Sequence, residues 1–181
     1  LATGTYSIKV GLPGAGASTN AYGVDGEDSI FSNITSIGGG GGANYDAAGK
    51  AGGSGGGSYI VVGQPAGNNP GLGTNINNGD ATNQGYNGGT VIQGSASGGG
   101  GGPARGSNGG IAATNTGSGG GGSGDGGSGG NGGSGVIILR YPNNYTAVFS
   151  SGVIQVEDNS VTGVKINTIT TAGTGSTITF S

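Results

Sequence analysis

The feature that most constrains this chain is a glycine block: residues 38–135 contain 41 of the chain's 51 glycines. Glycine loses more backbone entropy on folding than any other residue, and in a helix it costs about 1 kcal/mol relative to alanine. Neither the block nor the segments around it show the pattern of a capped, amphipathic helix. The sequence therefore predicts an all-β protein with almost no helix.

The segments on either side of the glycine block have the patterns of β-strands. Residues 5–10 alternate, which places Tyr6, Ile8 and Val10 on one face. Residues 29–37 are expected to form one further strand, although their apolar spacing fits a helix almost as well.

Three continuous apolar runs predict additional strands. Residues 136–141 form the longest, which ends at Pro142, and such runs are typically buried on both faces. Shorter runs at 58–62 and 90–93 lie within the glycine block. A flexible linker has no reason to contain apolar strands.

The glycine runs themselves allow two interpretations. One is a flexible Gly/Ser linker. The other is packed extended strands of the polyglycine II type, with three residues per turn and hydrogen bonds between neighbouring chains. We favour packing, because apolar strands alternate with the runs. The structural glycines of this interpretation are Gly38, Gly39, Gly40, Gly41, Gly42, Gly98, Gly99, Gly100, Gly101 and Gly102.

Composition excludes several classes of function. The chain has no His, Cys, Met or Trp, so serine–histidine and cysteine–histidine nucleophiles, zinc sites of Cys or His, and disulfides are ruled out. A net charge of −3 with five scattered cations gives no support for nucleic-acid binding, and no apolar run is long enough for membrane insertion. Carboxylates could still form a hydrolytic pair, but no pair stands out. We predict no enzyme activity, no catalytic residue and no cofactor.

Metal binding is expected to be absent, with two weak candidate sites. Asp25, Glu27 and Asp28 cluster in a predicted turn, where oxygen ligands could converge on calcium. Asp125 lies in a segment that approaches a calcium-binding nonapeptide repeat but occurs once. A solvated acidic loop is the alternative interpretation for both.

Four segments in order carry a resemblance to a known family: YSIKVG (6–11), DGEDSIF (25–31), the glycine run 38–42, and GGSGVIILRYP (132–142). Together they resemble the glycine-rich domain of bacteriophage tail-fibre and other virion proteins, over residues 1–142. The resemblance implies a β-sandwich or jelly-roll-like framework combined with packed polyglycine-II-type strands.

A second segment, VEDNSVTGVKI (156–166), resembles the repeat unit of phage fibre shafts and connectors, in which β segments of three chains wrap one axis. Residues 143–181 are therefore expected to form a short fibrous β tail that mediates self-association, with a trimer implied. Packing of this segment onto the first domain is the alternative. The residues assigned to oligomerisation are Val156, Val161, Val164, Ile166 and Ile169.

The function that follows is that of a phage virion structural protein: a tail fibre, a fibre tip or adhesin, or a decoration. The expected location is the virion or extracellular space, and the expected partners are further copies of the chain, other virion proteins and a receptor on the host surface. Loops at 64–84 and 103–116 are candidate contact regions, because Tyr and Asn suit adaptable recognition. A bacterial extracellular fibre or matrix protein is the alternative.

Overall fold

The structure is a computed structural model, and it describes residues 2–15, 17, 21–43, 49–57, 108–123 and 127–181. Within these residues, eight strands form two antiparallel sheets, and there is no helix. The prediction of an all-β fold is confirmed. The expected strands at 58–62 and 90–93 lie outside the described residues.

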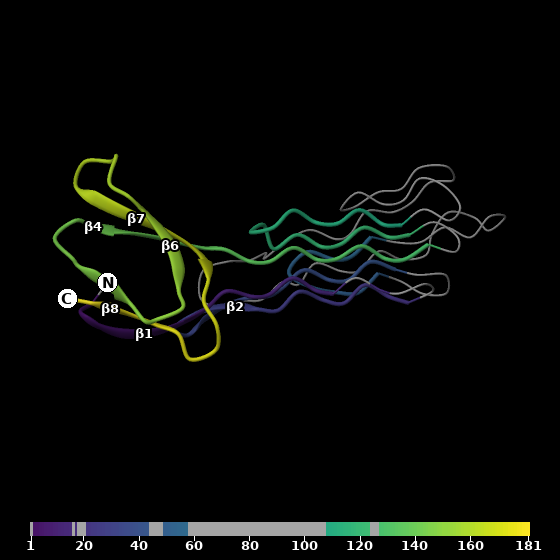
Figure 1. Cartoon of the computed structure of the whole chain (residues 1–181), viewed down its shortest axis with the longest axis horizontal. Coiled ribbons are helices and arrows are strands. Elements are labelled where there is room, and N and C mark those ends of the chain that lie inside the picture. The colour runs from purple at the N-terminus through teal and green to yellow at the C-terminus, as the bar shows by residue number, and fades with distance from the viewer. Residues whose placement is uncertain (1, 16, 18–20, 44–48, 58–107, 124–126) are drawn as a thin grey trace.

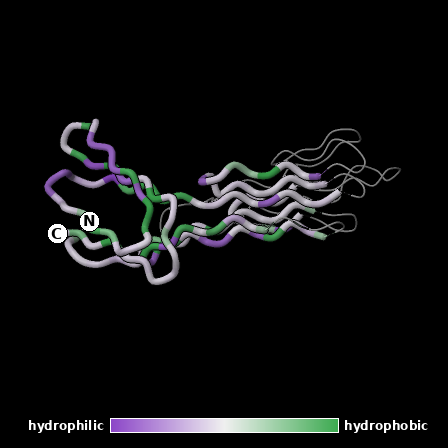
Figure 2. Tube along the Cα trace, in the orientation of Figure 1, coloured by the Kyte–Doolittle hydropathy of each residue, from purple (hydrophilic) through white to green (hydrophobic). Residues whose placement is uncertain are grey.

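The molecule has two parts, which Figure 1 shows side by side. The strands gather at one end in what we call the sandwich. Extended glycine-rich segments leave it and run alongside one another; we call this part the slab, formed by the described residues within 11–28, 37–57 and 108–135. Both chain ends lie in the sandwich. Most of the slab is close to neutral in hydropathy, as Figure 2 shows.

The larger sheet has the strand order β3-β2-β1-β8-β5. Its members are β1 (Gly4–Lys9), β2 (Ser29–Phe31), β3 (Ile34–Ser36), β5 (Ala147–Phe149) and β8 (Thr177–Phe180). The central pair, β1 with β8, joins the beginning of the chain to its end.

The smaller sheet has the order β4-β7-β6, from β4 (Ile137–Pro142), β7 (Val164–Thr171) and β6 (Ile154–Asp158). A register shift interrupts the β6–β7 pairing between Ile154 and Gln155. Because β7 pairs with β4 and β8 pairs with β1, both sheets combine strands from either side of residue 142. The segment expected to form a fibrous tail, 143–181, is thus integrated in the sandwich with residues of 1–142.

One hydrophobic core lies between the two sheets. The larger sheet contributes Ile8, Ile178 and Phe180, and the smaller sheet contributes Tyr141 and Ile169. Aromatic rings interlock here: the Tyr141 and Phe180 rings meet edge to face, with their centroids 5.0 Å apart. The alternation predicted for residues 5–10 is confirmed, since Ile8 and Val10 are buried.

Residues 29–37 form a hairpin, so the prediction of one strand was wrong. Phe31 pairs with Ile34 across a two-residue turn, and Ser32 has a φ of 54°. A positive φ at the first central position matches the tight turns that suit the twist of paired strands. The broken alternation of the apolar residues reflects this turn.

The apolar run at 136–141 is a strand, as predicted. The expectation that it is buried on both faces was wrong. Ile137 and Tyr141 are buried, whereas Ile138 is 64% exposed. The reason is topological: the smaller sheet packs against the other sheet on one face, and no described residues form a layer on its other face.

A polar network lies within this core. Asn167, fully buried, accepts a hydrogen bond from the Tyr141 hydroxyl through Oδ1, and its Nδ2 donates to Gln155 Oε1 at 2.6 Å. Burial, and secondly the charge of Glu157, raise the pKa of Tyr141 to about 12 from its ordinary 10.0. The folded state therefore holds the phenolic proton more tightly than the unfolded chain does.

Stability should consequently fall at alkaline pH because of Tyr141. Its contribution is complete below pH 10 and is lost as the pH rises towards 12, at roughly 1.4 kcal/mol per pH unit. Urea midpoints measured from pH 9 to 11.5 check this slope, with Tyr141→Phe as the comparison. Equal slopes in the two proteins would contradict the assignment.

Candidate functional site: a hydrogen-bonded glycine slab

The glycine runs of the slab are buried. Three of the four longer runs, at 38–42, 55–57 and 119–122, are described, and every glycine in them is buried. The prediction of packed runs is confirmed for these three, and the flexible-linker interpretation is wrong for them. The run 98–102 lies outside the described residues.

Hydrogen bonds between slab segments recur at every third residue. Residues 23–28 run antiparallel to 38–43, and the amides of Gly23 and Gly26 donate to the carbonyls of Gly42 and Gly39 at 3.0 and 2.9 Å. A β ladder would repeat every second residue, whereas a threefold extended helix repeats every third. This register identifies polyglycine-II-type packing.

The run 38–43 has neighbours on several sides, and each of them follows the same three-residue step. The further donor-to-acceptor pairs are Lys50 to Gly41 and Gly53 to Gly38 (antiparallel), Gly40 to Ser54 and Ala43 to Gly57 (parallel), and Gly120 to Gly40 and Ser123 to Ala43 (parallel). Four segments, counting 23–28, thus bond to this run through the backbone. Such bonds offset the large entropic cost of ordering glycine.

Close approach of these backbones explains why the residues are glycine. A Cβ on Gly41 would lie 2.0 Å from the carbonyl oxygen of Gly23, and one on Gly40 would lie 2.1 Å from that of Lys50. No described glycine of 38–42, 55–57 or 119–122 has a positive φ. Glycine is therefore required here for space and not for backbone conformation.

Two of the weak metal candidates, Asp25 and Asp28, bind the slab backbone. Asp25 Oδ1 accepts from the Gly41 amide at 2.8 Å, and Asp28 Oδ1 accepts from the Gly38 amide at 2.9 Å. The two aspartates are three residues apart, as are the glycines they bind. Lys50 Nζ also lies 3.8 Å from Asp25. Through these hydrogen bonds, the two carboxylates bind one side of the run 38–42.

Glu27, the third member of that cluster, pairs with Lys9 at 3.1 Å. The hydrogen bond and the charge of Lys9 lower the pKa of Glu27. Within the described ranges, no group of three or more acidic side chains is placed to hold a metal ion. Asp125 lies outside those ranges.

Removing the Asp28 carboxylate should destabilise the slab. Asp28→Ala leaves the buried Gly38 amide without its acceptor, and we expect a loss of about 1–3 kcal/mol in the free energy of unfolding. Asp28→Asn keeps an oxygen acceptor and should recover most of this loss. Urea midpoints and hydrogen exchange at Gly38 provide the measurement, and equal stability of Asp28→Ala and the wild type would contradict the role.

The i, i+3 spacing of Asp25 and Asp28 was a signal that sequence reasoning could have used. It matches the threefold repeat of the run that the aspartates bind. The spacing alone does not indicate which distant amides the carboxylates meet, because residues 23–28 pair with 38–43 only in the folded chain.

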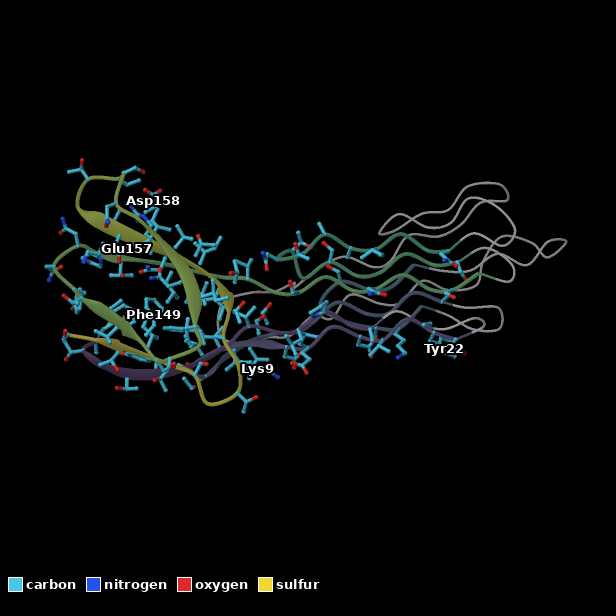
Figure 3. All side chains as sticks on the ribbon, in the orientation of Figure 1. Lys9, Tyr22, Phe149, Glu157 and Asp158 are labelled. Atoms are coloured by element: carbon cyan, nitrogen blue, oxygen red, sulfur yellow. The ribbon has the colours of Figure 1, made fainter. Side chains whose placement is uncertain are left out.

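Among the surface hollows at the junction between sandwich and slab, two are the larger. One, of about 230 Å³, includes Lys9 and Glu27 in its lining, and these two charges neutralise each other. The other, of about 250 Å³, lies between the β2–β3 hairpin and β4, with a largely apolar lining. Figure 3 shows Lys9 at this junction and Tyr22 well along the slab. Neither hollow brings together the convergent polar groups that a catalytic pocket needs.

The residues assigned to oligomerisation fall into two groups. Val156 and Val161 are exposed, and Val164 and Ile166 are half-buried on the smaller sheet or next to it. Ile169, in contrast, is fully buried in the core. It stabilises the sandwich and cannot contact another chain.

The fold and this site define a class: all-β proteins in which a two-sheet sandwich carries a slab of hydrogen-bonded glycine segments. The chain belongs to the glycine-rich domain family, whose model matches residues 1–142. No curated protein and no solved structure matches the chain. In the described part, no helix has the length and apolar character needed to cross a membrane.

Proposed function

We propose that this chain is a structural protein of a bacteriophage particle, acting as a tail fibre, fibre tip or decoration in assembly or attachment to the host. The assignment to a phage particle is supported by the resemblance to virion proteins of four segments: 6–11, 25–31, 38–42 and 132–142. The buried, backbone-bonded slab is the observation that supports a structural role without catalysis.

The arrangement suits a display scaffold. Both chain ends lie in the sandwich, while the slab extends away from it (Figure 1). Other virion proteins would join the chain at the sandwich end, and a host surface receptor would be met through the slab. Neither nucleic acid nor membrane insertion is part of this role. The candidate loop 64–84 lies outside the described residues.

The slab also explains how such a scaffold would resist the extracellular environment. Its segments bond through the backbone to several neighbours at once, so no single segment opens without breaking bonds to the others. Proteases act on opened segments, and a slab of this kind offers few. We therefore place the protein on the virion or otherwise outside the cell.

A bacterial extracellular fibre or matrix protein is the second candidate. The observation that favours it is the set of edge strands, β3 and β5 in one sheet and β4 and β6 in the other. Edge strands can template open polymerisation between chains. This candidate predicts filaments of indefinite length.

Immunogold electron microscopy distinguishes the two candidates. An antibody raised against the purified chain is applied to cells and particles from a culture of the source organism. We expect gold on phage particles. Gold confined to filaments or to the cell surface would overturn the virion assignment in favour of the matrix protein.

A further inference from the structure

The outer face of the β4-β7-β6 sheet, on the side away from the core, is apolar and uncovered among the described residues. Strand alternation turns Ile137 and Tyr141 of β4 towards the core, and therefore turns Ile138 and Arg140 outwards. The outer face comprises Ile138, Arg140, Val156, Asp158, Val164, Ile166 and Thr168.

The register arranges these side chains in rows across the three strands. Ile138 and Val156 both pair with Thr168 of the central strand, one on each side. Both are large apolar residues at the solvent surface, 64% and 68% exposed. Directly opposed residues point to the same face, so they flank Thr168 as an apolar row.

The next row carries opposite charges at its two ends. Arg140 on β4 and Asp158 on β6 both pair with Ile166 of β7. Two strand spacings, about 10 Å, separate the two charged residues. In the described part of the chain, Arg140 forms no ion pair. Hydrogen bonding to the Ser160 amide lowers the pKa of Asp158, so its carboxylate is charged at neutral pH.

We infer that further copies of this chain cover the outer face, with Arg140 of one copy against Asp158 of the next. Each of the two rows has one end on β4 and the other end on β6. A closed symmetric assembly that brings β4 of one copy against β6 of another therefore places Ile138 opposite Val156 and, at the same time, Arg140 opposite Asp158. In a dimer, a twofold axis parallel to β7 produces this pairing between two outer faces that pack against each other. In a trimer, a threefold axis produces the same pairing around a central channel lined by Ile166 and Val164 side chains. The inference deepens the self-association expected from the sequence, and it does not rest on the virion assignment.

Sedimentation equilibrium of the full chain tests this surface. We expect the wild type to show two or three times the monomer mass of 16.7 kDa at micromolar concentration. Val156→Asp places a charge in the apolar row and should reduce the protein to a monomer. Val148→Asp is the matched control, because Val148 is 60% exposed on the edge strand β5 of the other sheet. It should keep the wild-type mass.

Charge reversal tests the pairing itself. Arg140→Glu or Asp158→Arg alone should raise the dissociation constant of the assembly by about tenfold or more, because like charges then meet. The double variant should return it to within about threefold of the wild type. Thermal melts followed by circular dichroism verify that each variant folds.

A monomeric wild type, a Val156→Asp variant that stays assembled, or reversals without rescue would overturn the inference. None of these results bears on where the antibody binds in the immunogold experiment. Failure of this surface is therefore distinguishable from failure of the proposed virion function.

Discussion

Replacing Gly41 with alanine should disrupt the slab and lower the free energy of unfolding by about 3 kcal/mol or more. The added methyl would lie 2.0 Å from the backbone oxygen of Gly23, and Gly41 also bonds to Lys50 and Asp25. Backbone cannot rotate away as a flexible side chain can, and overpacking a dense interior typically costs 1–3 kcal/mol even where side chains can yield. Urea denaturation and hydrogen exchange of the amides in 38–42 provide the measurement.

The matched control is Gly173→Ala. Gly173 is an exposed glycine in the loop between β7 and β8; its φ is not positive, and a Cβ there would have no heavy atom within 4 Å. Alanine at a compatible glycine position changes stability by less than about 1 kcal/mol, often favourably. If Gly41→Ala and Gly173→Ala unfold within 1 kcal/mol of each other, the slab glycines are not required for space.

Local patterns predicted the strands of the sandwich better than the arrangement of the slab. The alternation of residues 5–10 and the apolar run at 136–141 each located a strand, because one buried face imposes period two on a sequence. Ser32 shows the limit of this reasoning. A positive φ at a serine, 54°, has no strong sequence signal, so the turn that makes residues 29–37 a hairpin was missed.

Whether a strand is buried on one face or on both depends on which layers of the fold cover it, and not on the strand's own sequence. Ile138 lies within an apolar run, yet it is exposed because none of the described segments covers the outer side of β4. Ile169 gives the opposite case: it was assigned to a contact between chains, but the alternation of β7 turns it to the face that packs against the other sheet. The packing of the two sheets decides both, and a single sequence does not contain it.

The type of packing in the slab was predictable from the sequence, but the register between its segments was not. Glycine content and interleaved apolar strands favoured packed threefold segments over a linker. A glycine run is nearly uniform, so it fixes neither which segments are neighbours nor whether they run parallel or antiparallel. Non-glycine residues resolve this: Asp25 and Asp28 bind amides three residues apart and so align 23–28 with 38–43. The polar residues between the runs thus supply the register that glycine lacks.

Asn167→Ala is the second substitution for which we expect a large effect, about 3 kcal/mol in the free energy of unfolding. Asn167 of β7 has no exposed surface, and on the core side of the smaller sheet it joins the Tyr141 hydroxyl of β4 to the Gln155 side chain of β6. Truncation removes both hydrogen bonds at once. Each lost hydrogen bond costs about 1 kcal/mol, although the Tyr141 hydroxyl keeps its longer bond to the Glu157 carboxylate at 3.4 Å, and the space vacated by the amide adds a cavity term.

Asn159→Ala provides the comparison, because Asn159 is exposed and its amide donates only to the exposed Glu157 carboxylate, at 3.0 Å. A surface change of this kind should alter stability by less than about 0.5 kcal/mol. For a chain of this size, a loss of 3 kcal/mol corresponds to a fall of about 6–12 °C in Tm, which calorimetry resolves from the control. Similar Tm values for the two alanine variants would show that the buried amide does not link the three strands of the smaller sheet.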